Sequence, residues 1–218
     1  MILEEAVGAD LKTTWPRLSV KQRIGVVDQI ITIQERLLEA SKRFQVYGSL
    51  YFTEDGAKFN FRRQIEVSTA SSSKFIIGPL AHRHFMETVL WESDLDSGPW
   101  HTPNDYIDSL ARSSLLQIRS RAHKETAIIT SRPFSFPVKP VSDLSNAAVC
   151  QMLQLVRTVT PHIVPLSPDH CLPLLWHRDL HDGNIFVSDE GKVTSIIDWQ
   201  DANILPLFLT IRKPQFLD

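Results

Sequence analysis

The chain has 218 residues, of which 43% are hydrophobic, and this suffices for one sizeable core or two small ones. Charged residues make up 22% and the formal net charge is only −2, so the composition gives no reason to expect nucleic acid as a partner. No apolar run reaches membrane-spanning length, and the acidic residues 1–6 lack the basic character of a signal or transit peptide.

The first predicted element is a helix over residues 19–43. Its apolar residues recur at helical spacing and form one stripe: Val20, Ile24, Val27, Ile31, Leu37 and Leu38. Ser19 and Gln22 have the spacing of a capping box, in which each side chain satisfies a free backbone amide of the first turn. The sequence therefore predicts an amphipathic helix with a defined start.

A β-hairpin is predicted after this helix. Residues 47–52 and 58–61 have strand composition, and the turn at 53–56 between them contains a glycine. A polar serine-rich loop then leads to another short strand at 75–77, which ends at a Gly-Pro pair.

Three further helices are predicted, at about 82–92, 102–123 and 143–160. The second has the clearest start, because Thr102 can cap it, a proline follows in the first turn and Asp105 is the acid at the third position. Its predicted buried residues are Tyr106, Ile107, Leu110 and Ile118. The core face of the third helix is predicted to include Ala148, Met152, Leu155 and Val159.

The last part of the chain is predicted to hold a buried strand and a second hairpin. A loop over 161–173 leads into the strand 174–176, and residues 185–187 and 192–197 pair across the turn 188–191. An antiparallel hairpin of this kind brings its two ends together.

Three polar residues flank these strands with the spacing that kinase-type enzymes use. Asn184 precedes the first strand of the hairpin, Asp198 follows the second, and Asp179 lies in the loop just before. Their carboxylate and amide oxygens are hard ligands, which suit magnesium. We expect Asp179 to orient a substrate hydroxyl and accept its proton, and Asn184 and Asp198 to hold magnesium against nucleotide phosphates. His177 and His181 are expected to brace the loop through hydrogen bonds.

Two other interpretations of this segment stay open. In one, Gly183 belongs to an ordinary turn, Asn184 caps it and Asp198 merely ends a strand. The other is a metal hydrolase site built on four clustered residues of types that bind metals: His177, Asp179, His181 and Asp182. No histidine follows in the sequence, so further ligands would come from upstream, where His82 and His84 form the one recognisable pair.

Residues 177–184 read H-R-D-L-H-D-G-N and residues 197–202 read I-D-W-Q-D-A. Together they resemble the aminoglycoside phosphotransferase and choline kinase-like family, whose pattern is H-x-D-L-H-x-G-N followed by I-D-W-x-x-A. Shorter segments at 47–52, 77–79 and 98–100 resemble the fungal altered-inheritance-of-mitochondria branch of that family, a likeness that spans nearly the whole chain.

This resemblance implies a bilobal protein-kinase-like fold that uses ATP and magnesium to transfer a phosphoryl group to a small-molecule hydroxyl. Under it, Asp179 matches the catalytic base, and Asn184 and Asp198 match the metal ligands. The fungal branch implies a mitochondrial location, while the lack of a visible targeting peptide leaves a cytoplasmic one open. The resemblance does not identify the acceptor.

The expected fold class is α+β and mostly α-helical: the C-terminal lobe of a kinase-like fold with short β-hairpins. Residues 1–218 are expected to form a partial domain with a hinge remnant at about 1–9 and this lobe over about 10–218. The lobe would hold a catalytic loop at 176–187 and a metal-binding segment at 196–202. The eight glycines form no G-x-G-x-x-G, so we expect the N-terminal, nucleotide-binding lobe to be missing.

Weak or absent catalysis by the chain alone is the expected consequence, because that lobe supplies several charge-stabilising groups. The alternative is a non-catalytic, pseudokinase-like module that binds or scaffolds other molecules.

Three sets of residues allow both a functional and a structural interpretation. Three tryptophans either line an acceptor pocket or pack in the core: Trp91, Trp100 and Trp199. Three acids either attract a cationic acceptor or belong to a solvated loop: Glu92, Asp94 and Asp96. Cys150 and Cys171 match neither a C-x-x-C nor a zinc spacing, which indicates reduced thiols.

Overall fold

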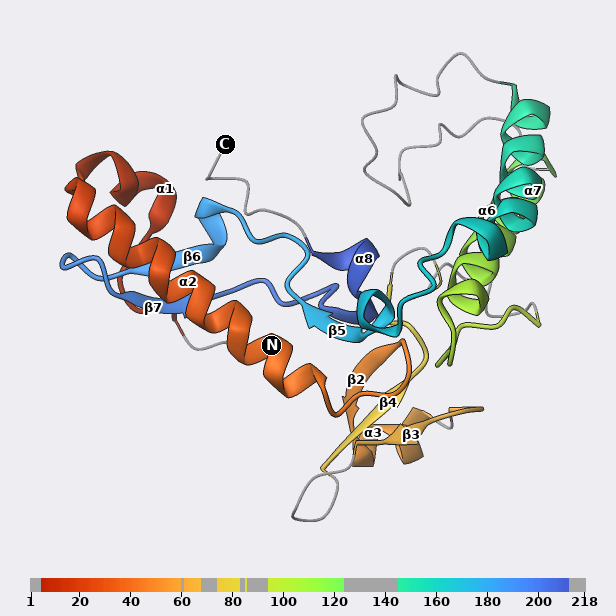
Figure 1. Cartoon of the computed structure of the whole chain (residues 1–218), viewed down its shortest axis with the longest axis horizontal. Helices are drawn as coiled ribbons and strands as arrows, with labels where there is room; N and C mark the ends of the chain where they lie inside the picture. The colour runs from red at the N-terminus through yellow and green to blue at the C-terminus, as the bar shows by residue number, and fades with distance from the viewer. Residues whose placement is uncertain are drawn as a thin grey trace. The chain divides into compact units, whose positions relative to one another are not determined.

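The computed structural model describes residues 5–59, 61–67, 74–82, 85, 94–123 and 145–211. The chain divides into two units: unit 1 comprises residues 1–44 and 172–218, and unit 2 comprises residues 45–171 (Figure 1). About half of the structure is helical, and the sheets among the described residues are small and antiparallel. The α+β class predicted from the sequence is confirmed at this level.

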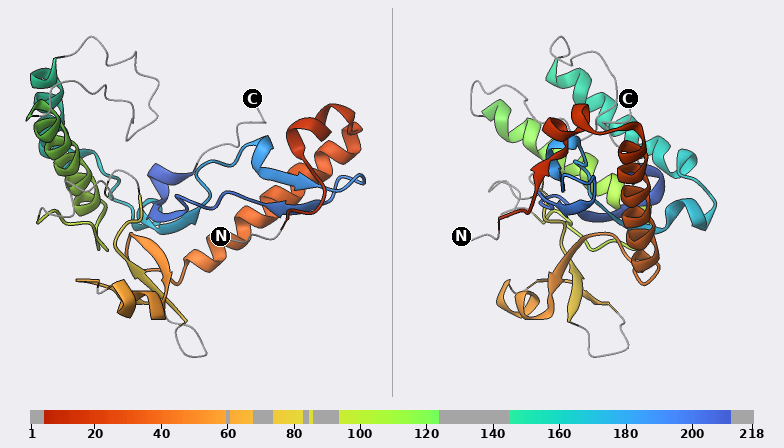
Figure 2. Two further views of the ribbon diagram at one scale, coloured as in Figure 1. Left: turned by 180° about the vertical axis from the view of Figure 1, so that it is seen from behind. Right: turned by 90° about the vertical axis from the view of Figure 1, so that its left-hand side faces the viewer.

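Unit 1 is built from one long helix and two small sheets. In chain order its elements are β1 (Ala9–Asp10), α1 (Leu11–Thr14), the 3-10 turn η1 (Trp15–Arg17), α2 (Val20–Ser41), β5 (Pro173–Trp176), the 3-10 turn η4 (Asp182–Asn184), β6 (Ile185–Val187), β7 (Val193–Ile196), β8 (Asn203–Pro206) and α8 (Leu207–Thr210). One sheet has the strand order β1-β6-β7, and the other pairs β5 with β8. Helix α2 lies alongside β7 and β5 (Figure 2).

Helix α2 begins where the sequence predicts. The Ser19 hydroxyl accepts a hydrogen bond from the Gln22 backbone N–H, and the Gln22 side chain accepts one from the Ser19 N–H. The capping box is thus confirmed, and it satisfies two amides that have no partner inside the helix.

The buried stripe of α2 is not the predicted one. Val26 and Ile30 are 0% and 2% exposed, and they pack with four other buried residues: Leu11, Leu18, Ile185 and Val187. The stripe chosen from the sequence lies mostly on the surface, with Val20 at 73%, Ile24 at 57% and Ile31 at 46% exposure. The helix is apolar along two neighbouring stripes, and spacing alone does not show which one the chain covers.

Unit 2 combines a three-stranded sheet with two long helices. Its elements are β2 (Ser49–Phe52), α3 (Thr53–Phe59), β3 (Ile65–Glu66), β4 (Phe75–Gly78), α6 (Pro103–His123), α7 (Asn146–Ile163) and the 3-10 turn η3 (Pro168–Cys171). The strand order is β2-β4-β3, with Phe52 opposite Phe75. The predicted strands at 47–52 and 75–77 are therefore confirmed in substance.

The hairpin predicted over residues 47–61 is wrong. Residues 53–59 form helix α3, and the partner of β2 is β4. Glu54 and Asp55 occupy the first turn of α3, where acidic side chains interact favourably with the helix dipole. The returning strand instead comes from the more apolar segment Phe75–Gly78.

Helix α6 confirms its prediction, including the start. The Asp105 N–H donates to the Thr102 hydroxyl at 3.1 Å, which in turn donates to the Asp105 carboxylate at 2.7 Å. Of its predicted core residues, Tyr106, Leu110 and Ile118 are buried, whereas Ile107 is only half-buried. The helix predicted at 82–92 falls almost wholly outside the described residues.

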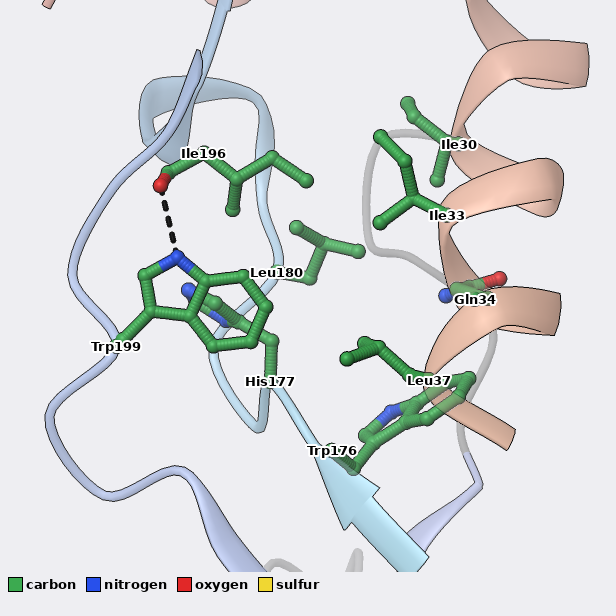
Figure 3. Close-up of a pocket in the computed structure, with 9 residues that line it drawn as sticks. All are labelled: Ile30, Ile33, Gln34, Leu37, Trp176, His177, Leu180, Ile196 and Trp199. Carbon is green, nitrogen blue, oxygen red and sulfur yellow. Dashed lines mark hydrogen bonds between the residues drawn. The ribbon is translucent and has the colours of Figure 1, made fainter. Parts of the chain in front are cut away.

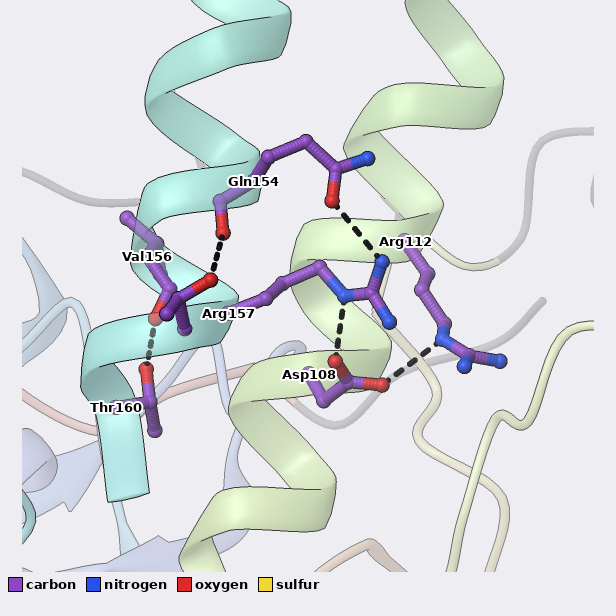
Figure 4. Close-up of polar contacts among 7 residues, drawn as sticks. Asp108, Arg112, Gln154, Val156, Arg157 and Thr160 are labelled. Atoms are coloured by element: carbon purple, nitrogen blue, oxygen red, sulfur yellow. Dashed lines mark hydrogen bonds and ion pairs between the residues drawn. The ribbon is translucent and has the colours of Figure 1, made fainter. Parts of the chain in front are cut away.

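The predicted core face of helix α7 is only partly correct, because Ala148 and Val159 are half-buried but the other two residues are not. Met152 and Leu155 are exposed at 55% and 61%. Arg157 instead points to α6, where its Nε donates to Asp108 at 2.6 Å, and Asp108 also accepts from Arg112 Nε at 2.8 Å (Figure 4). The ion pair turns this polar face inward, which an apolar pattern alone does not reveal.

No helix among the described residues is long and apolar enough to cross a membrane. Cys150 and Cys171 are free thiols of intermediate burial.

Candidate active site

The candidate site lies in unit 1, where two loops leave the same end of a strand pair. Strands β5 and β8 are antiparallel, with Trp176 opposite Asn203. The loop that carries Asp179 follows β5 directly, and the loop that carries Asp198 leads directly into β8. The start of the first loop therefore lies beside the end of the second.

The hairpin β6–β7 adds a second junction between the same loops. Ile185 pairs with Ile196, and the Ile197 N–H donates to the Asn184 carbonyl at 3.0 Å. This is the antiparallel pairing that the sequence predicts, and it places the backbone of Asn184 next to the residue before Asp198.

Asn184 is 7% exposed and joins the two halves of the loop. Its Nδ2 donates to the Asp179 carbonyl at 2.9 Å. The same carbonyl accepts from the His181 N–H at 3.0 Å. This hydrogen bond from the NH2 group fixes the orientation of the amide. Oδ1 is then free to accept a hydrogen bond or to coordinate a cation.

Asp198 is an exposed residue with a left-handed backbone, at φ 62°. Asp201, three residues later, has the same φ and is also exposed. Aspartate tolerates this region better than most residues, although it is uncommon for any side chain other than glycine. Directly after Asp198, the Ala202 N–H donates to the Trp199 carbonyl at 3.0 Å, which closes a tight turn over residues 199–202 that contains Asp201.

His177 braces the loop as expected. Its side chain is 4% exposed, and Nε2 is 2.8 Å from the Ile197 carbonyl, directly before Asp198. The Trp199 ring contacts it edge-on, with 4.8 Å between ring centroids and 73° between planes. Nδ1 is buried and has no hydrogen-bond partner among the described residues. The imidazole thus fixes the backbone on one side of Asp198 and the indole on the other.

His181 also braces the loop. Its Nδ1 accepts the Gly183 N–H at 3.0 Å and so caps the η4 turn, while Nε2 lies 3.7 Å from an Asp179 carboxylate oxygen. Nδ1 also lies 3.8 Å from Asp182 Oδ1. A Cβ at position 183 would come within 2.9 Å of the His181 ring, so the close approach requires glycine.

Behind these loops, α2 and the site segments enclose a small apolar pocket (Figure 3). Nine residues line it: Ile30, Ile33, Gln34, Leu37, Trp176, His177, Leu180, Ile196 and Trp199. The Trp199 Nε1 donates to the Ile196 carbonyl at 2.8 Å, which holds the indole over the strand end (Figure 3). Packing against α2 thus supports both loops from behind.

Sequence reasoning missed two glutamines of α2 that hold the hairpin turn. Gln29 Nε2 donates to the Gly191 carbonyl at 3.1 Å, and its Oε1 accepts from the Val193 N–H at 3.0 Å. Gln22 Nε2 donates to the Asp189 carbonyl at 3.3 Å. Two glutamines seven residues apart on one helix face were the available signal.

The structure describes four of the six tryptophans and acids for which the sequence allows both a functional and a structural interpretation. Trp100 is 1% exposed and packs against Phe85 and Tyr106 in the core of unit 2. Trp199 belongs to the site segment, while Trp91 and Glu92 lie outside the described residues. Two of the acids form ion pairs with unit 2 arginines: Asp94 with Arg62 and Asp96 with Arg63.

The two adjacent loops carry a carboxylate at Asp179, an amide oxygen at Asn184 and a carboxylate at Asp198. This donor set consists of oxygens, which fits magnesium better than softer metals. The described residues hold no group of three or more His, Cys, Asp or Glu placed to bind a metal, so they offer no ready-made zinc site.

Comparison with known proteins connects this geometry to a family. The phosphotransferase enzyme family matches residues 139–208, which include both loops. A subtelomeric hrmA-associated cluster protein of Aspergillus fumigatus is 26% identical over 246 residues, which cover 99% of this chain and 45% of that protein. No solved structure matches the chain.

Mitochondrial proteins are among the relatives as well. Altered inheritance of mitochondria protein 9 of Zygosaccharomyces rouxii is 26% identical over 223 residues, covering 95% of this chain and 34% of that protein. The chain thus spans less than half the length of these curated relatives. Both resemblances drawn from the motifs are confirmed: the chain is similar to the phosphotransferase enzyme family around its site and to fungal altered-inheritance-of-mitochondria proteins along nearly its whole length.

Proposed function

We propose that this chain carries the base and metal side of a kinase-like phosphotransferase site, the part that a C-terminal lobe supplies. The hydrogen bond from Asn184 to the Asp179 carbonyl supports the proposal most directly, because it ties the proposed base to a proposed metal ligand. The reaction class is transfer of the γ-phosphoryl group of ATP to a small-molecule hydroxyl.

In this reaction Asp179 orients the acceptor hydroxyl and takes its proton as the new O–P bond forms. The bond between the β- and γ-phosphates breaks, and ADP leaves. The Asp179 carboxylate is 61% exposed, so an acceptor can reach it without displacing protein groups.

Asn184 and Asp198 would hold magnesium through Oδ1 and the carboxylate. A magnesium ion held there would neutralise negative charge on the nucleotide phosphates. Asn184 contributes a fixed oxygen, and Asp198 contributes the negative charge on a backbone that His177 and Trp199 restrain.

We propose that these 218 residues alone turn over little substrate. Losing a single charge-stabilising donor typically costs on the order of 10²–10³-fold in rate. The sequence contains no glycine-rich phosphate loop, and the chain covers 45% of its Aspergillus fumigatus relative. The relatives named as mitochondrial support a mitochondrial location for the protein.

Nucleotide binding tests the metal site. We expect millimolar ATP with magnesium to raise the melting temperature, since a ligand at about five times its Kd stabilises a protein by roughly 1 kcal/mol. Asp198→Asn should abolish the magnesium-dependent part of this shift. Asp201→Asn is the matched control, with the same backbone conformation and similar exposure, and should leave the shift intact.

Equal shifts in the two variants, or a shift that does not need magnesium, would refute the metal assignment. Asp179→Asn separates chemistry from binding, because it should keep the shift and abolish any release of phosphate or ADP. If the wild-type chain binds magnesium-ATP and Asp179→Asn changes no measurable turnover, the chain is a non-catalytic nucleotide-binding module instead.

A further inference from the structure

The uncovered stripe of α2 has the spacing of a coiled-coil seam. Its positions follow each other at intervals of four, three, four, three and four residues: Val20, Ile24, Val27, Ile31, Gln34 and Leu38. Such a stripe stays on one side of a helix over many turns and fits a second helix laid along it. Val20, Ile24 and Ile31 are exposed, so the described residues leave most of this stripe uncovered, while Val27 and Gln34 are half-buried.

A second set of positions with the same kind of spacing faces the protein core. Val26, Ile30, Ile33 and Leu37 pack against the strands and the site loops. The two stripes lie about 100° apart around the helix, since each residue advances the helix by about 100°. Helix α2 can therefore hold the site loops on one side and bind a helix on the other.

Charged residues border the uncovered stripe on the side away from the core. Lys21, Asp28 and Glu35 stand seven residues apart and are all exposed. None of the three forms an ion pair among the described residues. When two copies of α2 lie antiparallel, Lys21 of each copy faces Glu35 of the other. Opposite charges therefore pair at both ends of the helix pair.

We propose that a second copy of this chain covers the stripe, forming a symmetric antiparallel pair of α2 helices. The seam residues then meet in layers: Leu38 with Val20 of the other copy, Ile31 with Val27, and Ile24 with Gln34. A two-fold axis repeats every layer and both Lys21–Glu35 pairs. This proposal does not depend on the phosphotransferase function.

The parallel arrangement fits the charges less well. It would place the charged row against the other flank of the partner helix, where Arg23, Ile30 and Leu37 lie. Arg23 already donates to the carbonyls of Trp15 and Pro16, and Ile30 is 2% exposed in the core. One like-charge contact, Asp28 with its own copy, remains in the antiparallel pair, and Asp28→Asn should strengthen association.

Sedimentation velocity of the full chain over micromolar concentrations tests the proposal. We expect a monomer–dimer equilibrium that Ile31→Glu shifts to monomer, because it places a charge in the seam. Thr32→Glu is the matched control: it adds the same charge one residue later, on an exposed position outside the stripe, and should leave the dimer intact. A chain that stays monomeric throughout, or a dimer that survives Ile31→Glu, overturns the proposal.

Charge exchange tests the orientation. Lys21→Glu or Glu35→Lys alone should weaken dimerisation by about fivefold or more, because each removes both symmetric pairs. The double variant should restore it, since the pairs re-form with their signs exchanged. A short bifunctional, thiol-reactive reagent should also cross-link two copies of Asp28→Cys, above the background from Cys150 and Cys171. Failure of both restoration and cross-linking excludes the antiparallel pair.

Discussion

Gln29 is expected to hold the hairpin that carries Asn184 and Asp198 at its open end. Its amide donates to the Gly191 carbonyl and accepts from the Val193 N–H, so one side chain satisfies two backbone groups of the turn region. In Gln29→Leu the side chain keeps similar bulk and both groups lose their partner. The hairpin should then separate from α2 at this end.

Gln29→Leu removes three hydrogen bonds, and the two that join α2 to the hairpin turn set the magnitude; the third, from Nε2 to the Gly25 carbonyl, lies within the helix. Each of the two contributes about 0.5–1.5 kcal/mol net, so Gln29→Leu should lower the free energy of unfolding by about 2 kcal/mol. Gln151→Leu is the control, because Gln151 is an exposed helical glutamine without a side-chain hydrogen bond among the described residues. Its substitution should change stability by about 0.5 kcal/mol or less.

Urea denaturation measures the loss, and amide hydrogen exchange locates it. Protection of the Val193 N–H should fall in Gln29→Leu and stay unchanged in Gln151→Leu. If the two variants unfold at the same urea concentration, or if Val193 keeps its protection, then Gln29 does not hold the hairpin and the reasoning is refuted.

Three further predictions concern the turn at Gly183, the contact between α6 and α7, and the loss of stability at alkaline pH. Gly183→Ala places a Cβ against the His181 imidazole, so it should lower the free energy of unfolding by about 1 kcal/mol and abolish the magnesium-dependent melting shift. The control Gly25→Ala meets open space within a helix and should raise the free energy of unfolding by about 0.5–1 kcal/mol. Double-mutant analysis of Asp108→Asn and Arg157→Gln should give a coupling of about 0.5–1 kcal/mol that shrinks in high salt; a coupling indistinguishable from zero at low salt would show that the bridge is not stabilising. Burial raises the pKa of Tyr51 to about 12 from its usual 10, so the folded state retains the proton longer, and stability that is complete below pH 10 should fall between pH 10 and 12. Tyr51→Phe should lessen that fall in pH-dependent thermal melts, and an unchanged slope would contradict the assignment.

Local signals in the sequence identified most elements of the fold. The capping box at Ser19, the cap at Thr102 and the β6–β7 hairpin each depend on neighbouring residues, and the structure confirms all three. These features are set by backbone groups within a few residues of each other, which is why one sequence suffices to predict them.

The errors arose where tertiary packing decides. Helix α2 is apolar on two stripes, and only the position of the hairpin determines that Val26 and Ile30 are buried while Ile24 is exposed. Residues 58–61 alternate like a strand, yet β4 provides a better partner for β2 than they do. Long-range pairing of this kind leaves no mark in a local pattern.

The sequence predicted the β6–β7 pairing that brings the two site loops together, but not the contacts that support them. Spacing alone singled out Asp179, Asn184 and Asp198, and the paired strands do bring their loops together. The glutamine contacts of α2 to the hairpin turn span more than 160 residues of sequence, so the spacing of the two glutamines indicates a shared helix face but not the partner of that face.

We propose above that Asn184 and Asp198 bind one divalent cation directly beside Asp179. Paramagnetic broadening of backbone amide signals by substoichiometric Mn²⁺, measured by nuclear magnetic resonance, tests it even if binding is weak. We predict that the amides of these three residues broaden first and together, and that Asp198→Asn removes the effect. Broadening centred elsewhere, or unaffected by Asp198→Asn, would contradict the account.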